Sequence, residues 1–125
     1  MENLFLKPTE DTPEVVFNIE NGNYSISGRS LPENAVLFYI PLLEWLNEFA
    51  SSSEKDMVFH FKLDYFNTAS AKQITKLLLA IQTIAETKKV TVKWHYYSED
   101  YDIKSSGARF AKLIKANIEL VSYED

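Results

Sequence analysis

Residues 57–64 read MVFHFKLD and give the strongest single indication of the fold class. Apolar side chains at every second position place one face of a strand against a core, while His60 and Lys62 take the other face. Residues 70–87 then carry apolar side chains at three- and four-residue spacing, which predicts a helix. Residues 90–96 alternate as the first stretch does. A strand, a helix and a strand in this order favour two parallel strands joined by a crossover.

On both sides of this strand–helix–strand segment, sequence patterns predict further elements. Residues 15–19 and 24–28 alternate around Asn21-Gly22-Asn23, which predicts a β-hairpin. A helix is expected from Pro32 and Glu33 toward Phe49, because Pro suits a first helical turn and apolar residues recur at helical spacing. Pro41 lies inside this run and predicts a kink rather than two separate helices.

Near the carboxyl end, residues 105–115 predict a third helix and residues 118–121 a last strand. The strands are half polar, whereas strands covered on both faces are apolar throughout, so the helices should lie mainly on one face. We therefore expect one α/β domain over residues 1–125, with two layers, a mixed β-sheet and the order ββαβαβαβ. The uncovered face would carry Asn18, Glu20, Ser25, Ser27, His60, Lys62, Lys93, His95 and Tyr97.

Composition excludes several classes of function. The 125 residues are 46% hydrophobic and contain no cysteine, so disulfides, thiolate metal sites and cysteine nucleophiles are excluded. A formal net charge of -5 disfavours nucleic acid as a partner. No secretory signal and no stretch long enough for a membrane span is apparent, and we expect a cytoplasmic protein without a membrane partner.

The turn from the central strand into the second helix, residues 63–70, is the candidate functional segment. The carboxyl end of a parallel strand meets the amino end of a helix there, and free backbone N–H groups favour an anion. Ser70 and Gln73 match a capping box, which is the interpretation we favour for Ser70. Thr68 lies just outside that cap; its position alone fits a turn residue somewhat better than a regulatory site.

Two other groups of residues are candidates for a chemical site. His60 and His95 occupy corresponding polar positions on two strands and suggest a metal or acid–base pair, but no third ligand accompanies them. Residues 99–102 form an acidic cluster without the calcium-loop pattern, and a solvated loop is expected. Because familiar catalytic motifs are also missing, we predict no catalytic residue, no metal, no cofactor and no enzymatic activity.

Several segments together carry a resemblance to a known family. They are Thr12–Val15, Pro32–Ala35, Phe38 and Tyr39 with Trp45, Leu63–Thr68, Trp94 with Tyr96, and Gly107 with Phe110. With these segments the chain resembles the SiaC family of bacterial regulatory phosphoproteins, small domains similar in fold to STAS-type anti-sigma factor antagonists. The resemblance implies a STAS-like (SpoIIAA-like) fold.

The resemblance also implies a partner-switching signalling protein. A protein kinase would phosphorylate Thr68, and a PP2C-type phosphatase would reverse the modification. The unmodified form would bind and activate a diguanylate cyclase or another output protein in c-di-GMP signalling and biofilm regulation. Ser70 is the alternative acceptor.

Phosphorylation adds roughly two negative charges, so binding should fall where a partner covers the acceptor. We expect Tyr65, Asn67, Thr68 and Ser70 to line the partner-binding surface, and Lys72 to hold the phosphate in the free domain. The alternative function is a small-ligand or nucleotide sensor of STAS-like fold that uses the amino end of the second helix as its anion site.

Overall fold

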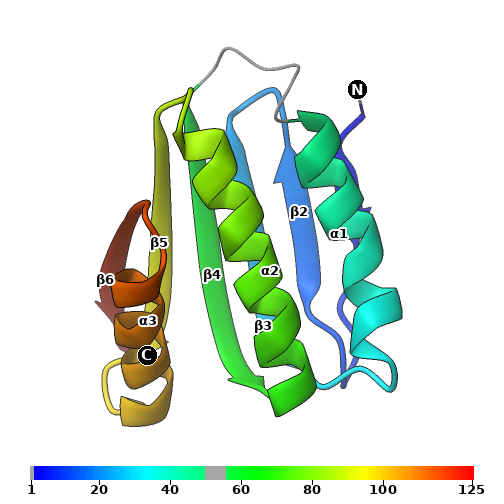
Figure 1. Ribbon diagram of the computed structural model, residues 1–125. Coiled ribbons are helices and arrows are strands. Elements are labelled where there is room, and N and C mark those ends of the chain that lie inside the picture. Colours follow the sequence, from blue (N-terminus) through cyan, green and yellow to red (C-terminus); the bar gives the residue numbers. More distant parts are fainter. Residues whose placement is uncertain (1, 50–55) are drawn as a thin grey trace.

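The computed structural model describes residues 2–49 and 56–125, and these residues form a six-stranded sheet with three helices (Figure 1). Along the chain the elements are β1 (Leu4–Leu6), β2 (Glu14–Asn18), β3 (Asn23–Ser30), α1 (Ala35–Phe49), β4 (Met57–Phe66), α2 (Thr68–Ala85), β5 (Val90–Tyr97), α3 (Tyr101–Leu113) and β6 (Asn117–Tyr123).

The sheet keeps its strands in sequence order from β1 to β6. The pairs β1–β2 and β2–β3 are antiparallel, whereas β3, β4, β5 and β6 run parallel to one another. One helix joins each parallel strand to the next, and the helices of the described part cover the same face of the sheet (Figure 1). This arrangement matches the predicted two-layer α/β fold with a mixed sheet.

The predicted element order was wrong at the amino end. The order is βββαβαβαβ rather than ββαβαβαβ, because β1 precedes the predicted hairpin. β1 pairs with β2 through Leu4–Phe17, Phe5–Val16 and Leu6–Val15. With only Leu4, Phe5 and Leu6 it is too short to show a period of two, and its place at the sheet edge comes from pairing that local sequence does not encode.

Aromatic side chains anchor α1 to the antiparallel half of the sheet. Phe17 of β2 packs against Trp45 of α1 with ring centroids 4.8 Å apart, and Trp45 stacks on Phe49 at 4.8 Å. Tyr24 of β3 lies 5.4 Å from Trp45 and 5.1 Å from Phe59 of β4. All five side chains are buried, and rings in such contacts add stability beyond their buried area.

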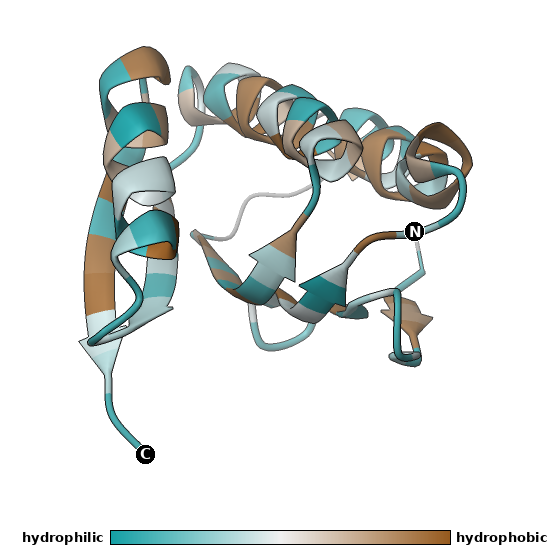
Figure 2. Cartoon of the chain, turned by 90° about the horizontal axis from the view of Figure 1, so that it is seen from below, coloured by the Kyte–Doolittle hydropathy of each residue, from teal (hydrophilic) through white to brown (hydrophobic). Residues whose placement is uncertain are grey.

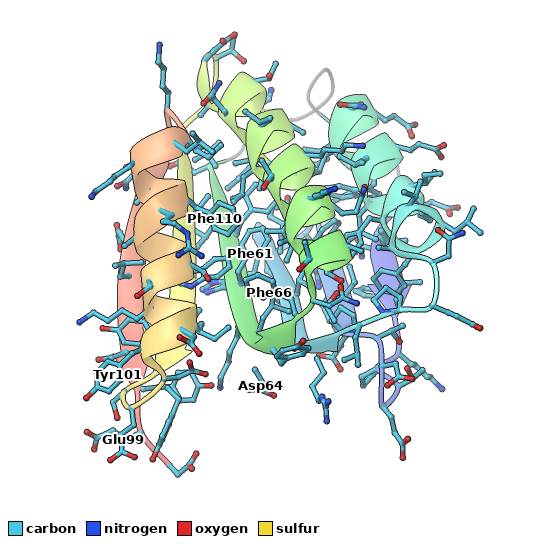
Figure 3. The ribbon with its side chains drawn as sticks, turned by 60° about the horizontal axis from the view of Figure 1, so that its bottom comes forward. Phe61, Asp64, Phe66, Glu99, Tyr101 and Phe110 are labelled. Carbon is cyan, nitrogen blue, oxygen red and sulfur yellow. The ribbon has the colours of Figure 1, made fainter. Side chains whose placement is uncertain are left out.

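Trp94 of β5 organises the other half of the core under α3. Its indole Nε1 donates a 2.9 Å hydrogen bond to the Ile103 carbonyl, and Gly107 lies directly against the indole ring. The aromatic rings around it are Phe61, Phe66 and Phe110, whose side chains lie in the layer between the helices and the sheet (Figure 3). A side chain at position 107 would displace this contact, so the close approach of α3 requires glycine.

α1 is one continuous helix with Pro41 inside it, as predicted. It begins at Ala35 and not at Pro32, because Asn34 acts as its cap: the Asn34 side-chain oxygen accepts a 3.1 Å hydrogen bond from the Leu37 N–H. α1 and α2 therefore begin in the same manner, because an asparagine side chain caps the first turn of each helix.

Candidate functional site

A β-bulge shapes the end of β4, where the candidate segment begins. Gly28 of β3 pairs with Leu63, but the next residue, Arg29, pairs with Tyr65, so Asp64 has no partner on β3. An extra residue of this kind bends a strand and changes the direction of the residues after it. The last residue of β4 accordingly packs against Trp94 in the core, and the chain turns directly into α2.

Asn67 is the N-cap of α2, and the predicted cap at Ser70 is therefore wrong. The Asn67 side-chain oxygen accepts a 2.8 Å hydrogen bond from the Ser70 N–H, and the Asn67 N–H donates to the Ser30 carbonyl at 3.1 Å. Thr68 is therefore the first residue of the helix, not a turn residue outside it. The capping box predicted for Ser70 and Gln73 was wrong, because Asn67 already supplies the capping oxygen three residues earlier.

Ser70 instead belongs to a buried hydrogen-bond relay. Its hydroxyl donates to the Ser30 carbonyl at 2.9 Å and accepts from the Ser30 hydroxyl at 2.9 Å. The Ser30 hydroxyl also lies 2.6 Å from the Tyr39 hydroxyl of α1. Burial raises the pKa of Tyr39 to about 12, although the hydrogen bond to Ser30 lowers it in part. The relay thus joins β3, α1 and the first turn of α2.

Thr68 is exposed, in contrast to Ser70, whose side chain is fully buried. It borders a groove between the amino ends of α1 and α2, which both start at the carboxyl edge of the parallel strands (Figure 1). The groove is lined by Glu33, Asn34, Ala35, Val36, Thr68, Ala69, Lys72 and Gln73. Two helix dipoles with positive ends and the Lys72 ammonium group favour a negative charge here, and Glu33 opposes it.

Acidic and aromatic side chains occupy the neighbouring part of the same edge. Figure 3 shows Asp64, Glu99 and Tyr101 there. The prediction of a solvated loop for the acidic cluster at residues 99–102 holds only in part: Glu99 and Asp100 lie in the turn after β5, whereas Tyr101 and Asp102 belong to α3. Asp100 caps that helix by accepting a 3.0 Å hydrogen bond from the Ile103 N–H. α3 accordingly begins at Tyr101, four residues before the predicted start.

The two histidines form a pair on the uncovered face of the sheet. His60 Nδ1 lies 2.9 Å from His95 Nε2, and the rings stack with centroids 5.2 Å apart. Burial lowers the pKa of His60, with a further contribution from Lys93. Burial likewise lowers the pKa of His95, followed by His60, Lys62 and Lys93. Among residues 2–49 and 56–125 no three His, Asp or Glu side chains gather as a metal site.

The predicted site residues fall into two sets. Thr68, Tyr65 and Lys72 lie at the surface of the edge where β4 meets α2, whereas Asn67 and Ser70 hold that edge in place through their hydrogen bonds. The relay partners Ser30 and Tyr39 were missed by sequence reasoning. No local pattern reveals them, because they lie 40 and 31 positions before Ser70 and meet it only through the fold.

None of the helices in the described part of the chain is both long and apolar enough to span a bilayer.

The chain matches one known family over nearly its whole length. A sequence model of the family described as "SiaC family regulatory phosphoprotein" matches residues 6–123. An uncharacterized protein of Pseudomonas aeruginosa (strain UCBPP-PA14) is 26% identical over 97 residues, which cover 77% of each chain.

Two crystal structures from P. aeruginosa have the same fold. Apo-SiaC superposes with a TM-score of 0.88 at 21% identity, covering 97% of this chain and 99% of that one. A chain in the complex of diguanylate cyclase SiaD with its activator SiaC superposes with a TM-score of 0.90 at 21% identity, covering 96% of this chain and 99% of that one.

Proposed function

Because this chain belongs to the SiaC family of regulatory phosphoproteins, we propose that it is a non-enzymatic switch protein controlled by phosphorylation of Thr68. In this proposal a protein kinase modifies Thr68, and a PP2C-type phosphatase removes the phosphoryl group. The unmodified form binds and activates a diguanylate cyclase or a similar output protein. The proposal rests on Thr68, which is exposed and is the first residue of α2, beside the groove between two helix amino ends.

Accessibility favours Thr68 over Ser70 as the acceptor. A kinase must bring a hydroxyl into its own active site, and the Ser70 hydroxyl is fully buried with two hydrogen bonds to Ser30. Reaching it would require the first turn of α2 to leave β3. Thr68 needs no such rearrangement, because its side chain is already exposed.

The surroundings of Thr68 are suited to a phosphoryl group. The first-turn N–H groups of α2 and the amino end of α1 supply partial positive charge, and Lys72 follows Thr68 by one helical turn. A phosphothreonine adds three strong acceptor oxygens and negative charge to a side chain that was neutral before. Lys72 then holds the phosphate in the free domain, and the side chain that position 68 presents to a partner changes from neutral to anionic.

A cyclase partner is supported by the structural likeness to the activator in the SiaD complex. The description of the family as regulatory phosphoproteins supports a role through binding rather than through chemistry. The same groove supports a second candidate, a sensor of phosphate-bearing small ligands, because two helix amino ends and Lys72 border it. Calorimetric titration with guanine nucleotides separates the candidates, since the sensor requires stoichiometric heat and the switch predicts none.

Intact-mass measurement after incubation with the cognate kinase tests the acceptor. Wild type should gain one phosphoryl group, and Thr68→Ala should gain none. Thr83→Ala, an exposed threonine on the same helix, is the matched control and should be modified like wild type. Ser70→Ala should also keep the modification. Phosphorylation that persists in Thr68→Ala would refute the assignment.

A further inference from the structure

The two edges of the sheet differ in how they are protected. β1 is an edge strand of three residues, and Pro8 follows it closely, so it offers little backbone for pairing. β6 is the opposite edge strand and is seven residues long. Residues 117–123 contain no proline, glycine, lysine or arginine, and Glu119 is their only charged residue. β6 therefore lacks the features by which edge strands avoid pairing with other chains.

The backbone of β6 directs every second residue away from the sheet. β6 runs parallel to β5, and the Tyr123 carbonyl accepts a 2.9 Å hydrogen bond from the Ser98 N–H, directly after β5. The N–H and C=O groups of one residue point to the same side of a strand, and the side alternates from residue to residue. Those of Ile118, Leu120 and Ser122 therefore point outward. Figure 2 shows β6 as the outermost strand, and no other described element lies beyond it.

Apolar side chains accompany these outward groups on the helix side of the sheet. Leu120 is 38% exposed, although it lies beside Gly107 of α3. Ala111 follows Gly107 by one turn on the same side of α3 and is exposed as well. The hydrophobic colouring of β6 is visible at this edge in Figure 2. Exposed apolar side chains next to unpaired backbone groups mark a place where another strand can add to the sheet.

β6 is complementary to a second copy of itself in one antiparallel register. A two-fold axis through Leu120, its middle residue, pairs the whole strand and places Leu120 opposite Leu120 of the second copy. The outward groups of Leu120 then bond to each other, and those of Ile118 bond to those of Ser122. Glu119 lies opposite Val121, so the carboxylates do not meet. An axis through Glu119 would place the two carboxylates opposite each other, which is unfavourable, and other axes leave more of the strand unpaired.

The helices above the two strands fit the same register. α3 contacts both β5 and β6, and adjacent strands are about 4.8 Å apart, so the two α3 helices would lie about 10 Å apart, an ordinary distance for packed helices. Gly107 is level with Leu120. Lys104, one turn before Gly107, therefore lies opposite Ala111 of the second copy, one turn after it. A long side chain thus meets a small one, and the two lysines stay apart.

We infer that the chain forms a symmetric dimer in which the two β6 strands pair antiparallel about Leu120 and join the two sheets into one. A second copy is the assigned occupant because one strand supplies both halves of a complementary register. β5 and α3 separate this edge from α2 (Figure 1). The dimer therefore leaves Thr68 of each copy exposed, and the inference does not depend on the proposed function.

Sedimentation equilibrium of the full chain tests the inference. Wild type should pass from a monomer of 14.4 kDa to a dimer as its concentration rises. Leu120→Lys places two cations opposite each other and should weaken dimerisation about tenfold or more, as for a residue at the centre of an interface. Ser122→Pro removes an outward N–H without removing a bond to β5 and should also weaken it.

Leu113→Lys is the matched control for the substitution at position 120. Leu113 is 67% exposed on α3, and six positions after Gly107 it lies on a different side of the helix. The variant should dimerise like wild type. Circular dichroism establishes that each variant keeps its secondary structure before its mass is measured.

Opposite charges at position 120 test the register itself. Leu120→Glu alone should also be monomeric, because it places two carboxylates opposite each other. An equimolar mixture of Leu120→Lys and Leu120→Glu should form heterodimers, since the two positions face each other across the axis. A wild type that stays monomeric into the millimolar range overturns the inference. So does a dimer that neither Leu120→Lys nor Ser122→Pro weakens, or a mixture of the two charged variants that does not associate.

Discussion

The Ser70 hydroxyl donates a 2.9 Å hydrogen bond to the Ser30 carbonyl, and this contact ties the first turn of α2 to the end of β3. Both side chains are fully buried, although both are polar. Buried polar groups that are completely hydrogen-bonded make a local structure rigid and unique. The relay therefore presents the neighbouring Thr68 in one fixed position at the surface.

Removal of the Ser70 hydroxyl should destabilise the domain without removing the phosphoacceptor. In Ser70→Ala the Ser30 hydroxyl loses its buried acceptor, and the expected loss in the free energy of unfolding is about 1–3 kcal/mol. Urea titration measures it. Ser105→Ala, an exposed serine on α3, should change stability by less than about 0.5 kcal/mol. Equal stability of Ser70→Ala and wild type would mean that the relay contributes nothing.

Gly107 should not tolerate a methyl group. In an exposed helix Gly→Ala raises stability by about 1 kcal/mol, but at position 107 the added carbon meets the Trp94 indole, and a net loss of about 1–3 kcal/mol is expected. Ala111→Gly, exposed on the same helix, measures the propensity effect alone. Thermal unfolding combined with tryptophan fluorescence gives both results, and a stabilised Gly107→Ala would contradict the close packing of α3.

Loss of the Asn67 cap should cost about 1 kcal/mol of stability, as for other helix caps. Asn67→Ala removes the oxygen that accepts from the Ser70 N–H, so the first turn of α2 should also fray around Thr68. Asn67→Asp keeps a capping oxygen and should retain most of the stability. Hydrogen exchange of the residue 68–71 amides reports the fraying, and unchanged protection in Asn67→Ala would count against this role.

Acid should weaken the domain through the histidine pair. The pKa of His60 and of His95 is lowered in the folded state, so the unfolded chain binds protons more readily below its ordinary histidine pKa of about 6.5. The contribution of the pair to the free energy of unfolding is therefore fully present above that pH. It is lost as the pH falls through the lower pKa values that the two histidines have in the folded state. Lys62 and Lys93 add repulsion once a histidine is charged.

The His95→Gln substitution separates the contribution of the histidine pair from other effects of acid. His95→Gln keeps a hydrogen-bonding side chain opposite His60 but removes one titrating group, so its stability should fall less than that of wild type between pH 7.5 and pH 5.5. Urea titrations at the two pH values measure the difference. Parallel losses in both proteins would show that the pair does not set the acid sensitivity.

Sequence reasoning predicted the elements that carry a strong local signal. The alternation in β4 and β5 and the helical spacing in α2 were sufficient, because each depends on residues close in sequence. β1 was not predicted, because the position of a three-residue edge strand depends on its pairing with β2 and not on its own sequence pattern. The STAS-like character of the fold stays a prediction.

The candidate segment lies between β4 and α2, as the sequence predicted, but its local structure differs from the prediction. Thr68 is the first residue of α2 rather than a turn residue, and Asn67 rather than Ser70 caps the helix, because the Ser70 hydroxyl is already hydrogen-bonded to Ser30. That relay depends on Ser30 and Tyr39, which only tertiary structure brings together. From the sequence only Ser70 was considered as the cap, and the contacts of Ser70 with Ser30 in the core leave Asn67 to cap α2.

The most direct test of the switch compares the unmodified chain with chain that is stoichiometrically phosphorylated on Thr68. Affinity for the purified cyclase of the same organism and its rate of c-di-GMP synthesis are measured for both forms. We expect the unmodified form to bind and activate the cyclase, and phosphorylation to weaken binding by at least about tenfold, equivalent to about 1.4 kcal/mol. Equal binding and equal activation by the two forms would contradict it.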